Sequence, residues 1–148
     1  MAVDITTEIV INRPRSQVSD FAANPDNAPA WYANIKQVTW ETEKPLAIGS
    51  RVAFVAAFLG RTLAYTYEVI KLEPGRTLVM STKQGPFPME TTYSWDDAPP
   101  NSTRMTLRNR GSPSGFSALA APLLSAQMRK ANEADLRALK RILETSTS

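Results

Sequence analysis

The segment PLLSAQMRKANEADLRALKRILE, residues 122–144, has the pattern of a long amphipathic helix and determines what the rest of the chain must provide. Its apolar residues recur every three or four positions and so share one side of a helix: Leu124, Met128, Ala131, Leu139 and Ile142, flanked by Leu136 and Leu143. Charged residues occupy the other side: Arg129, Lys130, Glu133, Arg137, Lys140, Arg141 and Glu144. Because such a helix is unstable alone, we expect its apolar side to pack on one face of a sheet.

We predict that this helix spans Phe116–Glu144, with Pro122 either near its start or at a kink. The preceding sequence predicts the sheet. Residues Val3–Ile11 alternate apolar and polar side chains with the two-residue period of a half-buried strand. Runs separated by turn residues predict six more strands: Val38–Glu43, Arg51–Leu59, Leu63–Leu72, Thr77–Thr82, Met89–Trp95 and Thr103–Asn109.

Turns and short helices complete the predicted order. Gly60-Arg61 and Pro74-Gly75 suit tight turns between antiparallel strands. A short helix is predicted to follow Pro14 and to end at Asn24-Pro25-Asp26, and a second helical turn is predicted within Asn27–Ile35. The predicted fold class is α+β, with a seven-stranded antiparallel sheet, two short helices and one long C-terminal helix.

Length and composition limit the functions that the chain can have. A chain of 148 residues is the size of one ordinary domain, so we predict a single domain over residues 1–148. It contains no cysteine and no histidine, which excludes disulfides, thiolate metal sites and Ser-His-Asp triads. No glycine-rich phosphate loop is present either. We therefore predict no metal site and no cofactor.

Charge and hydropathy indicate the partners. The 17 basic and 14 acidic side chains give a net charge of +3, too mild an excess to indicate nucleic-acid binding. Asp4 and Glu8 near the N-terminus do not fit a signal peptide, so we expect a cytoplasmic protein. The longest apolar run, Val52–Leu59, is too short for stable membrane insertion. The oligomeric state stays open, a homodimer included.

The order of these elements resembles the helix-grip fold of the SRPBCC or START-like superfamily, in particular its polyketide cyclase/dehydrase-like branch. Four stretches carry the resemblance, which covers nearly the whole chain: EIVINRPRSQVSDFAANPDNAPAWYANI (8–35), IGSRVAF (48–54), YEVIKLEPGRTLVMST (67–82) and the helical segment quoted above. The resemblance implies a strongly curved sheet wrapped around the long helix, with a cavity between them for a hydrophobic or amphipathic small molecule. It does not specify a function, because proteins with this fold have several.

Strand alternation identifies the side chains that would face this cavity. We predict a ligand-binding set from the strands, from the segment after the first helix and from the long helix: Trp31, Tyr32, Phe54, Phe58, Tyr65, Tyr67, Met80, Met89, Thr91, Tyr93, Trp95, Met105, Phe116, Leu119 and Met128. A dry core accommodates three inward phenols poorly, since each unpaired buried hydroxyl costs about 1 to 3 kcal/mol. Tyr65, Tyr67 and Tyr93 therefore favour a ligand-filled or solvated cavity over an ordinary core.

Three functions fit these features. The first is binding, transport or presentation of a hydrophobic or aromatic small molecule, which we favour. The second is a polyketide cyclase or dehydratase, and the third is a protein-interaction domain of the co-chaperone or toxin type. Whether the chain is an enzyme stays open, because we find no inward carboxylate; acid–base chemistry would need tyrosine hydroxyls or a loop acid such as Asp26. No catalytic residue is assigned.

Overall fold

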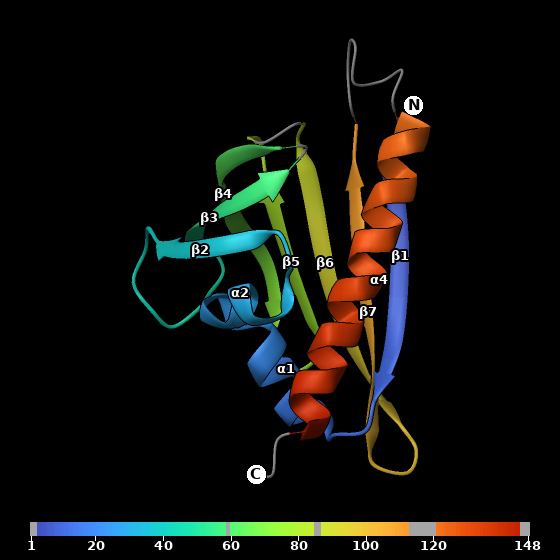
Figure 1. Ribbon diagram of the computed structural model, residues 1–148. Helices are drawn as coiled ribbons and strands as arrows, with labels where there is room; N and C mark the ends of the chain where they lie inside the picture. Colours follow the sequence, from blue (N-terminus) through green and yellow to red (C-terminus); the bar gives the residue numbers. More distant parts are fainter. Residues whose placement is uncertain (1–2, 59, 85–86, 113–120, 146–148) are drawn as a thin grey trace.

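The computed structural model describes residues 3–58, 60–84, 87–112 and 121–145 (Figure 1). The elements follow in the order β1 (Val3–Ile11), α1 (Arg15–Ala22), the 3₁₀ helix η1 (Pro25–Asn27), α2 (Ala28–Trp31), β2 (Ile35–Trp40), β3 (Arg51–Phe58), β4 (Arg61–Glu73), β5 (Thr77–Thr82), β6 (Met89–Ala98), β7 (Ser102–Gly111) and α4 (Ala121–Thr145). The predicted α+β class is confirmed.

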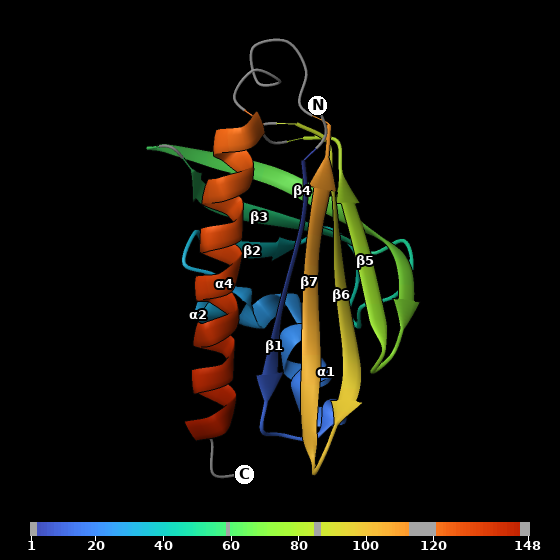
Figure 2. The same cartoon turned by 90° about the vertical axis from the view of Figure 1, so that its right-hand side faces the viewer.

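The seven strands form one antiparallel sheet in the order β1-β7-β6-β5-β4-β3-β2. The sheet curves so strongly that β2 and β3 run across the direction of β1 and β7 (Figure 1). Helix α4 lies along the concave side, and α1 and α2 fill one end of the space between helix and sheet (Figure 2). The long amphipathic helix thus packs on the sheet, as its pattern predicts.

Several boundaries differ from the prediction. Strand β2 begins three residues early, at Ile35, because Ile35 already pairs with Ala56; it ends at Trp40, which pairs with Val52 near the start of β3. Arg61 belongs to β4, where it pairs with Phe58, so the predicted Gly60-Arg61 turn is wrong by one residue. The Pro74-Gly75 turn is confirmed, since Gly75 has a φ of 77°. Residues 116–120 of the predicted helix lie outside the described part.

Among the described residues, the buried apolar side chains form two packed clusters. The larger fills the end next to α1 and α2 and includes Trp95, Met105 and Leu139 of α4, each at most 1% exposed. The smaller lies at the other end and holds Val3, Ile5, Phe87, Ala121 and Leu124. The two clusters are separate, so the apolar core is divided along the length of α4.

Gly111 at the end of β7 allows the close approach that positions Phe87. A Cβ atom there would lie 2.5 Å from the Pro88 carbonyl oxygen and 2.7 Å from the ring of Phe87, which leaves room for glycine alone. Phe87 is thereby held against the interior. Among the described residues, no helix has both the length and the apolar character that crossing a bilayer requires.

Candidate functional site

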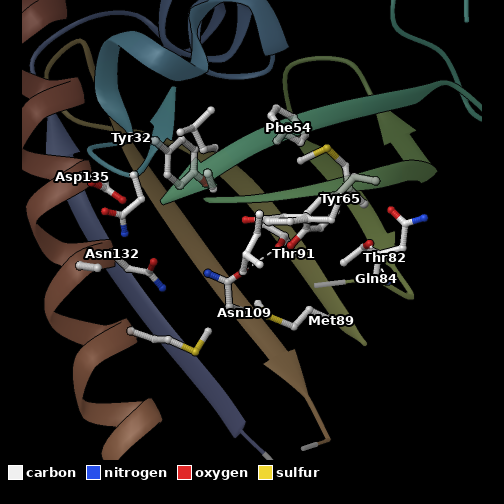
Figure 3. A pocket seen from close by; sticks show the side chains of 18 of the residues that line it. Tyr32, Phe54, Tyr65, Thr82, Gln84, Met89, Thr91, Asn109, Asn132 and Asp135 are labelled. Carbon is white, nitrogen blue, oxygen red and sulfur yellow. Dashed lines mark hydrogen bonds between the residues drawn. The ribbon is translucent and has the colours of Figure 1, made fainter. Parts of the chain in front are cut away.

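A cavity of about 380 Å³ lies between the concave side of the sheet and α4 (Figure 3). This volume is within the range of sites for small molecules. The lining comes from β2 to β7, from α4 and from the connections between α2 and β2 and between β5 and β6: Tyr32, Asn34, Ile35, Phe54, Ala56, Ala57, Leu63, Tyr65, Tyr67, Met80, Thr82, Gln84, Phe87, Met89, Thr91, Tyr93, Asn109, Gln127, Met128, Ala131, Asn132 and Asp135.

The cavity reaches the protein surface. Three of its lining side chains are exposed: Asn34 after α2, Gln84 after β5 and Gln127 on α4. Thr82, Thr91 and Asn109, in contrast, are at most 7% exposed. A ligand therefore has a way in from solvent and a buried, polar interior to contact.

The structure brings many of the predicted site residues together on the cavity wall: Tyr32, Phe54, Tyr65, Tyr67, Met80, Met89, Thr91, Tyr93 and Met128. Trp31, Trp95 and Met105 are not part of this lining; they lie in the part of the larger packed cluster that does not reach the cavity. Trp95 and Met105 occupy positions whose side chains face the concave side of the sheet. They pair with each other, however, at the end filled by α4, α1 and α2. Phe116, Leu119 and the side chain of Phe58 lie outside the described residues.

The predicted ligand-binding set omits apolar lining residues, namely Ile35, Ala56, Ala57, Leu63, Phe87 and Ala131, and a larger group of polar ones. The polar residues matter more for the chemistry of the site. They are Asn34, Thr82, Gln84, Asn109, Gln127, Asn132 and Asp135. A signal for some of them was present. Asn109 continues the inward alternation of Met105 and Leu107, and Asp135 follows Met128 by seven residues, two helical turns on the same side of α4.

Tyr32 and Tyr93 form a buried pair at one end of the cavity. Their hydroxyl oxygens lie 2.5 Å apart, and the ring of Tyr32 contacts Trp31 with centroids 4.1 Å apart. Burial raises the pKa of both tyrosines well above the usual range, and the proximity of the two phenols raises that of Tyr32 further. Both hydroxyls are therefore protonated at neutral pH and can act as hydrogen-bond donors.

Replacing either member of this pair should destabilise the protein. In Tyr32→Phe or Tyr93→Phe the remaining hydroxyl loses its partner, at a cost of about 1 to 2 kcal/mol. The double variant should cost less than the sum, because both partners are then gone. Urea unfolding of the three variants measures this. Tyr65→Phe is the control, since the Tyr65 hydroxyl makes no hydrogen bond within the described residues, and strictly additive costs would contradict the pairing.

Asp135 of α4 corrects the expectation that no carboxylate faces the cavity. The side chain is 4% exposed, lines the cavity and accepts a hydrogen bond of 3.1 Å at Oδ1 from the Ala33 backbone N–H. Burial raises the pKa of Asp135 to about 6, although the Ala33 bond opposes the shift. Because the pKa of Asp135 is close to physiological pH, this carboxyl group is able to donate or accept a proton there, next to the phenols.

Polar groups also line the sheet side. Thr91 and Asn109 face each other in the register of β6 and β7, and the Thr91 hydroxyl donates to the Asn109 side-chain oxygen at 2.6 Å. Each lies two residues along its strand from the Tyr93–Leu107 pair and therefore points to the same side of the sheet. The part of β6 and β7 that lines the cavity thus carries a polar pair on its inward side, next to the apolar residues of the packed core.

Asp26, the loop acid considered from sequence, does not line the cavity. Its carboxylate pairs with Lys44 at 2.6 Å and accepts from the Trp40 indole at 2.8 Å. The Lys44 hydrogen bond lowers the pKa of Asp26, so this acid is a poor proton donor. Within the ranges that the structure describes, no group of three acidic side chains is placed to hold a metal ion, and we assign no metal or cofactor ligand.

Comparisons with known proteins agree with this architecture. The profile of a family described as "Polyketide cyclase / dehydrase and lipid transport" matches residues 2–144, whereas no curated protein sequence matches. TTHA0849 from Thermus thermophilus has a similar structure, with a TM-score of 0.82, 17% identity and coverage of 98% of this chain and 99% of that chain. The Zhui aromatase/cyclase from Streptomyces sp. R1128 has a TM-score of 0.81 and 16% identity, with coverage of 97% of this chain and 94% of that chain. A START superfamily protein from Mycobacterium smegmatis has a TM-score of 0.80 and 14% identity, with coverage of 95% of this chain and 97% of that chain. At these identities the likeness extends to the helix-grip fold alone.

Proposed function

The chain belongs to the polyketide cyclase/dehydrase and lipid transport family, and on that premise we propose that it binds a hydrophobic or aromatic small molecule in the cavity between the sheet and α4. Transport or presentation of the molecule would follow from the same binding. The family and the fold suggest either hydrophobic ligand binding or a cyclase-type function. The cavity supports the first of these.

The observation that carries the proposal is a cavity of about 380 Å³ between two packed clusters. Protein interiors are normally close-packed, and a void of this size forfeits many contacts. Its aromatic wall, with Phe54 set edge-on to Tyr67 at 5.8 Å between centroids, suits a flat apolar molecule. Met80, Met89 and Met128 add adaptable surface.

Binding can be tested with N-phenyl-1-naphthylamine, a neutral apolar fluorophore. We expect saturable 1:1 binding with a dissociation constant in the micromolar range, typical of an unoptimised ligand in such a pocket. Native mass spectrometry of freshly purified protein should show a co-purifying small molecule that the fluorophore displaces. Linear, non-saturating fluorescence together with mass spectra of protein alone from several hosts would contradict the proposal.

A second candidate is a cyclase or dehydratase that acts on the bound molecule. Asp135 favours it, because its pKa of about 6 fits a general acid or base and it lies in the same cavity as the protonated phenols of Tyr32 and Tyr93. Incubation with a linear poly-β-ketone separates the two functions. A catalyst accelerates ring formation and loses this acceleration in Asp135→Asn, whereas a carrier only binds the compound.

The third function considered from sequence, a co-chaperone or toxin-type interaction domain, requires a filled interior and an exposed apolar patch. The cavity argues against the first requirement. The interaction domain is therefore the least supported of the three functions.

A further inference from the structure

The α4 side of the cavity holds a hydrogen-bond donor that the protein itself does not satisfy. Asn132 is 6% exposed and lines the cavity, yet its side-chain nitrogen Nδ2 is buried without a partner among the described residues. Its side chain points from α4 toward the sheet (Figure 3). Since buried amide groups are nearly always hydrogen-bonded, this nitrogen indicates a place for a group of the ligand.

One helical turn further along, Asp135 supplies an acceptor. The two side chains leave the same side of α4 at a spacing of three residues. Only Oδ1 of Asp135 takes the Ala33 N–H; no hydrogen bond to Oδ2 is found in the described part of the chain. Its pKa of about 6 leaves the carboxylate charged at pH 7.5. No lysine or arginine is among the described residues that line the cavity, so no cation there offsets this charge.

These two side chains select among polar groups by elementary hydrogen-bond chemistry. A hydroxyl or a carboxamide both accepts and donates, so it can take the Asn132 N–H and donate to Asp135. An ammonium can pair with the Asp135 carboxylate but only donates, so it leaves the Nδ2 of Asn132 without an acceptor. A carboxylate only accepts and places a second negative charge near Asp135 without a countercharge.

We propose that the ligand bound in this cavity carries an uncharged hydroxyl or carboxamide group between Asn132 and Asp135, and that this end of the cavity rejects carboxylates. This rests on the proposed binding function and names the class of molecule: an apolar or aromatic body with a neutral polar head, such as a phenol. Free fatty acids and aromatic acids are excluded from this orientation. Thr91 and Asn109 on the opposite wall offer polar contacts to the far end of a longer ligand.

Four probes of similar size test the head-group preference at pH 7.5: naphthalene, 2-naphthol, naphthalene-2-carboxamide and 2-naphthoate. Isothermal titration calorimetry, with competition against N-phenyl-1-naphthylamine for weak binders, measures each affinity. We expect the naphthol and the carboxamide to bind at least about tenfold more tightly than naphthalene, because they satisfy Asn132. We expect 2-naphthoate to bind at least about tenfold more weakly than the naphthol.

Two variants separate the roles of the side chains. Asn132→Leu should remove most of the advantage of the naphthol over naphthalene. Asp135→Asn should raise the affinity for 2-naphthoate, relative to that for naphthalene, about tenfold or more. Glu133→Gln is the matched control, since it removes one negative charge from an exposed position of the same helix and should change no affinity.

The outcomes distinguish this inference from the binding function on which it rests. If naphthalene and N-phenyl-1-naphthylamine bind but all four naphthalene probes have equal affinities, or 2-naphthoate binds tightest, the inference is wrong and the binding function stands. If none of the compounds binds, the binding function is wrong and the inference falls with it. A charge effect of equal size in Glu133→Gln would place the discrimination outside the cavity.

Discussion

Replacing Asp135 with asparagine is expected to stabilise the protein by about 2 to 3 kcal/mol at pH 8. The side chain is 4% exposed and its pKa is raised to about 6 from an ordinary value of 3.8, so the charged form is disfavoured in the native state. A shift of about two units corresponds to this free energy at about 1.4 kcal/mol per unit. Asparagine keeps the oxygen that accepts from Ala33 and removes the buried charge, and its new amide N–H groups can be solvated from the cavity that residue 135 lines.

The pH dependence of this gain follows from proton linkage. Between about pH 6 and pH 4 native Asp135 holds a proton that the unfolded chain has released, so the contribution of Asp135 to stability becomes more favourable as pH falls through this window. Above pH 6 the burial cost is present in full. Below pH 4 the group is neutral in both states, and the advantage of Asp135→Asn should disappear.

Urea unfolding at pH 8 and pH 4 measures both effects. Asp20→Asn serves as the control, because Asp20 is an exposed acid on α1 and its replacement should be nearly neutral at either pH. Equal stability of Asp135→Asn and the unsubstituted protein at pH 8 would show that water or a ligand solvates the carboxylate. A buried acid that lowers stability is typical of binding and catalytic sites, where stability is given up for function.

The fold was predictable because its signals are local and repeat. The two-residue period of β1 and the helical period of α4 each depend on many side chains, so no single residue decides the assignment. The start of β2 was less predictable. Ile35 joins the sheet through its pairing with Ala56, a contact between segments that the local pattern of residues 35–40 does not encode.

The candidate site was predictable on the sheet and not on the helix. Alternation shows which side of the sheet Tyr93 and Trp95 face, but not where along β6 the cavity begins. Trp95 was therefore predicted to line the cavity, although it lies in the packed cluster and is not part of the lining. Asp135 was missed for another reason. Sorting α4 into apolar and charged sides leaves out Asn132 and Asp135, whose polar side chains interrupt the apolar side.

That interruption has a counterpart on the sheet. Going away from the end near α1, the inward pairs of β6 and β7 change from Trp95 with Met105 to Thr91 with Asn109. On α4 the change runs from Leu139 to Asp135 in the same direction. Polar residues on inward positions of both the sheet and α4 are therefore the sequence signal of the cavity in this chain, and on the sheet the signal depends on knowing the register.

Filling the cavity from α4 should abolish binding. Ala131 lines the cavity on the helix side, and in Ala131→Phe the added ring would occupy the space that an aromatic ligand needs. We expect the affinity for N-phenyl-1-naphthylamine to fall by about a hundredfold or more, since two rings cannot share the volume. Ala126→Phe is the matched control: Ala126 is exposed on the same helix and outside the cavity lining, so its replacement should leave the affinity unchanged.

Comparing the stabilities of Ala131→Phe and Ala126→Phe shows whether the cavity is open. A ring forced into a close-packed interior costs about 1 to 3 kcal/mol, whereas a ring that enters existing space buries apolar surface and offsets that cost. Both alanine replacements lose similar helix propensity, about 0.5 kcal/mol, so their difference reports the cavity alone. Ala131→Phe should therefore be at least as stable as Ala126→Phe. Retained affinity in Ala131→Phe would place the probe elsewhere on the protein, and a loss of about 1 to 3 kcal/mol relative to the control would mean that the interior has no room for a guest.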